Sequence, residues 1–374
     1  MAVSLSSLST LVGVFVLSVL LLACTVPTTE GANILFFIGC GSPSHRISIM
    51  PLANGLADEG HNVTFVVQEK PDGNDSKINY YVPKEVTKHL KERRGSGNVL
   101  DLYWMRSKGL VIAMWFVIPW FGTTVCENLY NDPEYIVWLE SNKFDLVIID
   151  GLLNECGYGV AHLHNAKIIL SSVSSVLPWA VEPLGIPDES SSIPDTMFHF
   201  PSQNFFQRLF RAVIPIIWQM YREYIYLPKL ERITKEGLGV EDFPSFAEIE
   251  RNVSLTFINT HVAQEYPRSL PPNVVPIGGI SWVEKRKPLP KKMEDFINKG
   301  KEGFVYISFG SFVDLTKFPD EIQQRFINAL LKFPSIQFLW KLNKTPENLP
   351  DNFYVDKWLP QQDILRELHA ATNE

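Results

Sequence analysis

The chain contains little cysteine, and this scarcity limits what can hold it together. Four cysteines occur among 374 residues. Cys24 lies in an apolar leader and would be removed with it, which leaves Cys40, Cys126 and Cys156. Three thiols are too few for the framework of several disulfides that staples a small secreted domain. We expect buried free cysteines, with one disulfide as the alternative.

An excess of positive charge is also lacking. The sequence has 34 Lys and Arg against 41 Asp and Glu, a formal net charge of −7 and a pI near 5.7. Binding to nucleic acid requires a basic face for the phosphates, so a nucleic-acid partner is not expected. A metal pair is not expected either, because His162 and His164 are two residues apart and point to different sides of a helix.

Long apolar runs are absent after the leader. Residues 11–24 have the length of a signal-peptide core, so residues 1–32 are expected to be a cleaved signal, with an uncleaved anchor as the alternative because no positive charge precedes the run. The later apolar stretches 110–121 and 212–218 are too short to span a bilayer. Four glycosylation acceptor triplets fit a luminal chain; they begin at Asn62, Asn74, Asn252 and Asn343.

The composition describes a globular protein with room for two domains. Apolar residues make up 45% of the chain and charged residues 20%. Buried strands are predicted at residues 33–39 and 62–67, joined by the loop CGSPSH and a helix over residues 47–59. This order is typical of a parallel α/β unit, in which loops at the carboxyl ends of the strands face the ligand crevice.

Two interpretations of the loop compete. Gly39 and Gly41 begin like a dinucleotide-binding turn, and Glu69 follows the second strand where a ribose-binding acid would lie, but position 44 is Ser instead of the third glycine. This leaves a nicotinamide-dependent oxidoreductase as a distant alternative. The other interpretation takes His45 as a general base, because a neutral imidazole accepts a proton near physiological pH.

A carboxylate is expected at the same crevice. The strand over residues 144–150, FDLVIID, ends in Asp150 after four apolar positions. A carboxylate there can accept the second ring N–H of His45, fix the tautomer of the ring and stabilise its protonated form. The sequence therefore predicts a His45–Asp150 dyad.

The middle of the chain predicts further helices and strands. A helix is expected over residues 83–93, and the aromatic-rich segments up to residue 142 belong either to an acceptor pocket or to the core. A strand at 166–172 precedes a surface loop at 173–202. Residues 203–237 predict one or two helices, interrupted at Pro215 and Pro228. Their apolar face either packs on the core or touches a membrane, and we expect packing.

A second α/β unit follows a charged, proline-rich linker at residues 284–293. It comprises a strand at 304–309, a turn at Gly310 and Ser311, a helix at 319–332 and a strand at 336–341. The hydroxyl and backbone N–H groups of the turn are suited to phosphate oxygens. A short strand at 352–358 presents Trp358 beside Gln361 at its end, where an indole can stack on a flat base.

Together these segments resemble the UDP-glycosyltransferase family, the lumen-facing membrane enzymes of the glucuronosyltransferase type. The resemblance runs from the signal to about residue 365. The segments that carry it are GSPSH followed by PLANGLADEGHNVTFV, FDLVIID, VVPIGGISW, FVYISFGS and DKWLPQQDIL, in the order of the family.

The resemblance implies an α/β fold of glycosyltransferase-B type, with two Rossmann-like domains. Residues 33–283 would bind a small lipophilic acceptor, and residues 294–374 would form a partial domain for a UDP-sugar donor. The family's reaction transfers a hexosyl or glucuronosyl group with inversion, and it requires no metal or cofactor. By position in the matching motifs, the implied site residues are His45 as base, Asp150 as its partner, Gly310 and Ser311 at the diphosphate, Trp358 and Gln361 at the uracil, and Arg268 near the donor.

The chain departs from the family after Leu365. Family members continue through a His-Gly-Gly turn that grips phosphate and then a membrane-spanning helix, whereas residues 366–374 match neither. We therefore expect a C-terminally truncated member, and an inactive acceptor-binding or partner-modulating protein is the alternative function. The resemblance also implies the endoplasmic reticulum lumen or membrane as the location, with secretion as the alternative for a chain without the anchor. Homo- or hetero-oligomers with full-length family members are among the implied partners.

Overall fold

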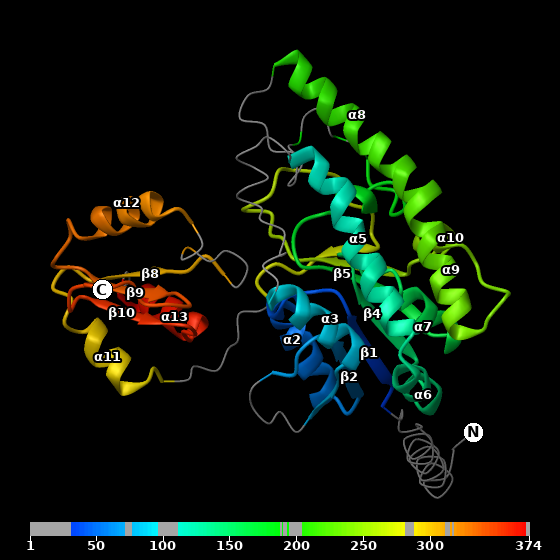
Figure 1. The fold of residues 1–374 in the computed structure, drawn as a ribbon, viewed down its shortest axis with the longest axis horizontal. Helices are drawn as coiled ribbons and strands as arrows, with labels where there is room; N and C mark the ends of the chain where they lie inside the picture. Colours follow the sequence, from blue (N-terminus) through cyan, green and yellow to red (C-terminus); the bar gives the residue numbers. More distant parts are fainter. Residues whose placement is uncertain are drawn as a thin grey trace, which may run out of the picture.

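The structure contains two parallel β-sheets, each with its own apolar core (Figure 1). It is a computed structural model that describes residues 31–71, 77–95, 111–187, 189, 193, 204–280, 288–310, 315 and 318–371. The seven strands of the first sheet follow the order β3-β2-β1-β4-β5-β6-β7. Those of the second follow the order β10-β9-β8.

The strands of the first sheet are short and strongly apolar. They are β1 (Asn33–Ile38), β2 (Asn62–Val67), β3 (Ile78–Tyr81), β4 (Leu146–Asp150), β5 (Lys167–Ser172), β6 (Leu255–Ile258) and β7 (Val274–Pro276). Four of them were predicted close to these bounds, because an apolar run of this length is typical of a strand buried on both faces. Along β1, Leu35 and Phe37 enter one core cluster while Phe36 enters the other, as the two-residue period of a strand requires.

Helices cover both faces of this sheet. Helix α2 (Pro43–Asp58) packs on the face of Phe36 through Ile49 and Ala53. The helices at the face of Phe37 are α3 (Lys84–Gly95), α5 (Val111–Tyr130), α6 (Pro133–Ser141), α7 (Gly157–Leu163), α9 (Leu227–Leu238) and α10 (Phe246–Arg251).

Helix α2 begins earlier than the sequence indicated. The prediction placed His45 in a loop and began the helix at residue 47, whereas the helix begins at Pro43 and includes His45 in its first turn. Pro43 stands at the start of the helix, where its missing N–H costs no hydrogen bond and its fixed φ suits the helix.

Helix α8 (Phe205–Tyr221) also differs from the prediction. It passes through Pro215 without a break and continues as a π-helical turn, Arg222–Tyr226, into α9, where Pro228 lies in the first turn. One side packs as expected, with Trp218 buried against Trp179. The opposite side exposes a row of large apolar side chains, namely Phe205, Phe206, Leu209, Phe210, Val213, Ile216, Ile217 and Met220.

No helix among the described residues reaches the length and apolarity that a bilayer crossing requires. Three of the four glycosylation triplets begin at exposed residues, Asn62, Asn252 and Asn343. Asn74 lies outside the described residues.

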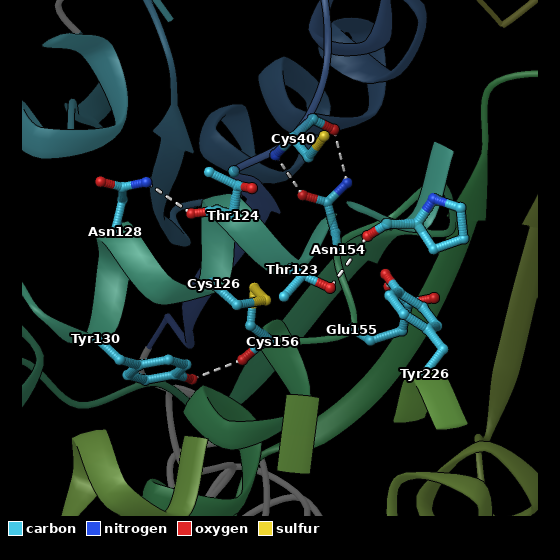
Figure 2. The surroundings of a disulfide bond; sticks show 12 residues. Cys40, Thr123, Thr124, Cys126, Asn128, Tyr130, Asn154, Glu155, Cys156 and Tyr226 are labelled. Atoms are coloured by element: carbon cyan, nitrogen blue, oxygen red, sulfur yellow. Dashed lines mark hydrogen bonds between the residues drawn. A yellow bond between two sulfur atoms is a disulfide. The ribbon is translucent and has the colours of Figure 1, made fainter. Parts of the chain in front are cut away.

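The expectation that all three cysteines are free was wrong, and the alternative of one disulfide is confirmed. Cys126 on α5 and Cys156 just before α7 form a disulfide, with their Cα atoms 5.7 Å apart, and Cys40 remains free (Figure 2). Both bonded cysteines are fully buried in the same core cluster. Their spacing of 30 residues in the chain carried no sign of this proximity, which arises only when α5 and α7 pack on the same face of the sheet.

A buried ion cluster lies beside the disulfide. Arg222 donates to Glu155 at 3.0 Å and to both carboxylate oxygens of Glu250 at 2.6 and 2.5 Å. Tyr158 and Tyr226 donate their hydroxyls to the same carboxylates. Burial raises the pKa of Glu155, although the Arg222 charge acts in the opposite direction. The cluster joins the π-helical turn to the segment that precedes α7.

The second sheet comprises β8 (Phe304–Ile307), β9 (Gln337–Lys341) and β10 (Phe353–Asp356). Helices α11 (Lys291–Ile297), α12 (Asp320–Leu330) and α13 (Gln361–Ala371) accompany it. Part of the range expected to be a linker, residues 284–293, is therefore helical from Lys291 onward. Met293 and Phe296 of α11 are buried, which explains why this charged segment folds as a helix.

We expect Arg222→Met to destabilise the protein by about 3–5 kcal/mol, because it leaves two buried carboxylates without their cation. The measurement is urea unfolding followed by far-UV circular dichroism. Arg251→Met is the matched control, since Arg251 also contacts two carboxylates but is 46% exposed; its change should stay within about 1 kcal/mol. Equal losses for the two variants would contradict a special role for the buried cluster.

Candidate active site

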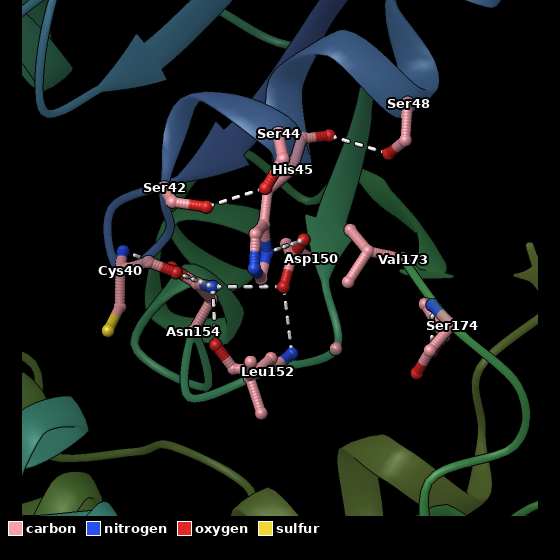
Figure 3. A network of polar contacts seen from close by, with 12 residues as sticks. Cys40, Ser42, Ser44, His45, Ser48, Asp150, Leu152, Asn154, Val173 and Ser174 are labelled. Carbon is pink, nitrogen blue, oxygen red and sulfur yellow. Dashed lines mark hydrogen bonds and ion pairs between the residues drawn. The ribbon is translucent and has the colours of Figure 1, made fainter. Parts of the chain in front are cut away.

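His45 and Asp150 are in direct contact, as the sequence predicted (Figure 3). His45 lies in the first turn of α2, directly after β1, and Asp150 is the last residue of β4. The His45 Nδ1 atom is 2.8 Å from Asp150 Oδ2. The two side chains are 12% and 4% exposed. The contact joins residues that are 105 positions apart in the chain.

The neighbours of Asp150 define the hydrogen-bonding roles. Its Oδ1 atom accepts the backbone N–H of Leu152 at 2.9 Å. An ionised carboxylate only accepts hydrogen bonds, so Nδ1 of His45 carries the donated proton. In the neutral ring, Nε2 is then the unprotonated nitrogen that can receive a proton.

The pKa of His45 is raised above its ordinary value of 6.5. Burial by itself lowers this pKa, because it disfavours the charged ring. The hydrogen bond and the negative charge of Asp150 act in the opposite direction and outweigh burial. The pair therefore forms a base that holds a proton more firmly than a free histidine.

Asn154 joins this cluster, and sequence reasoning missed it. It follows β4 on the segment that leads to α7, and its amide nitrogen lies 3.4 Å from Asp150 Oδ1. In the sequence, an asparagine in GLLNECG indicates only a turn. Its partners come from a distant strand end, so no local pattern marks it.

A cavity of about 260 Å³ lies beside the first turn of α2, at the carboxyl ends of β1 and β2. Its polar lining includes Ser42, Arg46, Gln68 and Glu69. Glu69 was considered above as a ribose-binding acid, and the structure places it in this cavity. The cavity lies at the carboxyl edge of the sheet, the edge at which ligands bind in open α/β sheets, on the β2 side of β1.

Predicted donor-binding residues gather at the carboxyl end of β9. Gly310 adopts a φ of 77°, a conformation that favours glycine, and its carbonyl accepts the Lys341 ammonium at 3.2 Å. The same ammonium lies 5.0 Å from the centre of the Trp358 ring. Trp358 is 63% exposed, so a face of the indole is open to a ligand. Ser311 lies outside the described residues.

Gln361 and Lys341 complete this group. Gln361 Oε1 accepts the Tyr306 hydroxyl at 3.1 Å, which holds the amide beside β8. Lys341 was not among the predicted site residues, although a cation at a strand's carboxyl end is a usable signal. Burial lowers the pKa of Lys341. The cation nevertheless lies close enough to Trp358 for a cation–π interaction.

Arg268 is not brought to either group by a hydrogen bond among the described residues. It lies between β6 and β7, half-buried, and its Nε atom has no hydrogen-bond partner there. Within the described ranges, no hydrogen bond or ion pair links the His45 group with the Trp358 group. The structure thus forms two separate groups, one around His45 and Asp150 and one around Trp358, and Arg268 belongs to neither.

Comparison with known protein families gives one match that covers most of the chain. Residues 41–373 match the family described as "UDP-glucoronosyl and UDP-glucosyl transferase". The chain belongs to this family. The match includes all seven predicted site residues and both sets of contacts, and it leaves the oxidoreductase alternative without support.

Curated family members show similarity along nearly the whole chain. UDP-glucosyltransferase 2 of Dactylopius coccus is 30% identical over 357 residues, covering 92% of this chain and 65% of its own length. UDP-glucuronosyltransferase 1A3 of Rattus norvegicus is 29% identical over 358 residues, with the same two coverages. The chain therefore spans slightly less than two thirds of the length of these relatives.

Solved structures confirm the fold class. The spinosyn forosaminyltransferase SpnP superimposes with a TM-score of 0.50 at 16% identity, covering 89% of this chain and 72% of that one. The spinosyn rhamnosyltransferase SpnG also gives a TM-score of 0.50, at 13% identity and with coverages of 89% and 73%. The fold is α/β of the glycosyltransferase-B type, as the family resemblance implied.

We expect Asp150→Asn to lower the pKa of His45 below 6.5, because burial then acts without the opposing charge. The measurement is an NMR titration of the histidine ring signals.

A raised folded-state pKa stabilises the protein fully below the unfolded value of 6.5, and the contribution disappears as pH rises through the folded value. The stability difference between wild type and variant should therefore shrink over that window.

Asp145→Asn is the matched control, because Asp145 precedes the opposite end of β4 and accepts the backbone N–H of Asn33. It should leave the His45 titration unchanged. A His45 pKa that stays raised in Asp150→Asn would contradict the assignment of the shift to this carboxylate.

Proposed function

We propose that this chain acts as a UDP-glycosyltransferase, which transfers a hexosyl or glucuronosyl group from a UDP-sugar to a hydroxyl of a small lipophilic acceptor. Family membership supports the donor and the reaction class. The observation that carries the mechanism is the 2.8 Å contact of His45 Nδ1 with Asp150, because it leaves Nε2 as the proton acceptor. His45 is the general base, and Asp150 orients and stabilises its protonated ring.

The proposed reaction is a single displacement. The acceptor hydroxyl gives its proton to Nε2 of His45, and its oxygen forms a bond to the anomeric carbon of the sugar. The bond between that carbon and the diphosphate oxygen breaks, and its electron pair leaves with UDP. Attack opposite the leaving group inverts the anomeric centre, so no covalent intermediate with the protein forms.

The second sheet supplies the proposed donor contacts. The open face of Trp358 is suited to stacking on uracil, and the amide of Gln361, held by the Tyr306 hydroxyl, is the second proposed uracil contact. The turn that begins at Gly310, followed by Ser311, is suited to the diphosphate. Lys341 lies between Gly310 and Trp358 and adds a positive charge close to where the diphosphate would lie. Arg268 is proposed as a further contact near the donor.

We also propose that the protein acts in the secretory pathway, in the lumen or at the membrane of the endoplasmic reticulum. The Cys126–Cys156 disulfide supports this location, because disulfides persist in oxidising compartments. The exposed glycosylation triplets and the apolar leader at residues 11–24 are consistent with it.

We expect His45→Ala to reduce sugar transfer by about 10²- to 10⁴-fold, the usual contribution of a general base. The measurement is transfer from UDP-glucose and UDP-glucuronate to a panel of small phenols, followed by chromatography. His162→Ala, at an exposed histidine near the end of α7, is the control. Turnover that survives His45→Ala would contradict the mechanism. Absence of turnover in the wild type together with acceptor binding would favour the alternative of an inactive acceptor-binding protein.

We expect Trp358→Ala to weaken UDP binding by about 5- to 150-fold, which corresponds to the 1–3 kcal/mol of stacking one base on an aromatic ring. The measurement is isothermal titration with UDP. Phe333→Ala is the matched control, because Phe333 is an exposed aromatic residue shortly before β9, at the opposite strand end from Lys341. Equal affinities for wild type and Trp358→Ala would exclude the stacking role.

A further inference from the structure

Asn154 connects the two segments that carry His45 and Asp150. Its side chain is buried, with 1% of the residue exposed. The side-chain oxygen accepts the backbone N–H of Cys40 at 2.6 Å, and the side-chain nitrogen donates to the Cys40 carbonyl at 2.8 Å. This reciprocal pair fixes the backbone between β1 and α2, five residues before His45, across 114 positions of sequence (Figure 3).

The same amide also holds the segment after β4. Its nitrogen donates to the Leu152 carbonyl at 2.8 Å and lies 3.4 Å from Asp150 Oδ1. An amide nitrogen carries two N–H groups, which the two 2.8 Å bonds use. The longer contact therefore acts mainly by electrostatic attraction between the amide dipole and the carboxylate. One side chain thus touches Asp150 and the backbone that leads to His45.

The segment around Asn154 is held in an uncommon conformation. Leu153 has a φ of 62°, a region that costs a side-chain-bearing residue free energy and persists only where the surroundings enforce it. The next residue, Glu155, is fixed by Arg222, and Cys156 is fixed by its disulfide. Strained backbone of this kind gathers at functional sites. These contacts on both sides therefore fix the position of the Asn154 side chain.

We propose that Asn154 is the positioning residue of the His45–Asp150 pair, which locks the β1–α2 backbone to the β4–α7 segment so that Nδ1 of His45 meets Oδ2 of Asp150. This role rests on the proposed function of His45 as base. The close hydrogen bonds of Asn154 go to the backbone of Cys40 and Leu152. It acts by fixing the distance and direction between the two catalytic groups, since small displacements of reacting groups are costly in rate.

The charges around His45 make its pKa a measure of the contact with Asp150, and therefore of the positioning role of Asn154. Within the part of the chain that the structure describes, Asp150 on β4 is the ionisable group that forms an ion pair with the ring. On the β1–α2 segment, burial together with Asp150 and Glu155 raises the pKa of Cys40 to about 12, so the thiol stays uncharged. Glu155, on the segment after β4, is paired with Arg222. The His45 titration therefore reports chiefly its contact with Asp150.

The test is Asn154→Ala in the full chain, read by NMR titration of His45 and by transfer kinetics. Loosening of the pair should move the pKa of His45 down toward 6.5. The kcat value should fall by about 10²-fold, with little change in the KM for the acceptor, as expected when orientation is lost and binding is kept. Asn154→Ser, which keeps a shorter hydrogen-bonding group, should give the same changes at smaller size and serves if the alanine variant does not fold.

Asn128→Ala is the matched control. Asn128 donates to the Thr124 carbonyl within α5 (Figure 2), and among the described residues it forms no hydrogen bond with either segment. It should leave the His45 titration and kcat unchanged.

An Asn154 variant that is folded by near-UV circular dichroism and keeps the wild-type His45 pKa would overturn the proposal, whatever its activity. If the wild type shows no transfer, the proposed function fails. The titration still decides whether Asn154 positions the pair.

Discussion

Parallel pairing of β1 with β4 is the constraint on which the site depends. The register places Phe37 opposite Ile149, so the backbone after β1 and the end of β4 meet at the same edge of the sheet. The chain passes from β1 to β2 on one side and from β4 to β5 on the other, and this reversal opens a crevice between the two connections. His45 and Asp150 meet at this edge, and Asn154 contacts Asp150 there. A shift of one residue in this pairing would turn Asp150 toward the other face of the sheet.

Burial strengthens the electrostatic attraction between His45 and Asp150, and it also makes an unpaired charge costly. Asp150 is 4% exposed, and its charge is tolerated because both carboxylate oxygens have hydrogen-bond partners. A low local dielectric strengthens the attraction to His45 and raises the pKa of its ring. The Arg222 cluster follows the same rule, because each charge in it is matched by hydrogen bonds. Two buried polar networks therefore flank the segment from Asp150 to Cys156, one at each end.

The two sheets contribute different chemistry. The first positions the proposed base within a rigid, well-packed core, where strands and helices determine the geometry. The second presents the exposed ring of Trp358 beside the half-buried Lys341, which suits a surface that binds a flat base and a charged diphosphate. Family membership joins the two sets in one proposed reaction. The Arg268 side chain lies half-buried between β6 and β7, and its Nε atom has no hydrogen-bond partner among the described residues.

The sequence by itself determined most of the strands, the family, and the pairing of His45 with Asp150, because apolar runs mark buried strands and carboxyl-terminal residues of neighbouring strands converge. Local sequence signals also predicted the turn at Gly310 and the accessible indole of Trp358. Tertiary structure alone decided the Cys126–Cys156 bond, the Asn154 contacts and the buried Arg222 cluster. Each joins residues that are distant in the chain, and their proximity exists only after helices have packed on the sheet. A single sequence records which groups are available, whereas packing selects which of them meet.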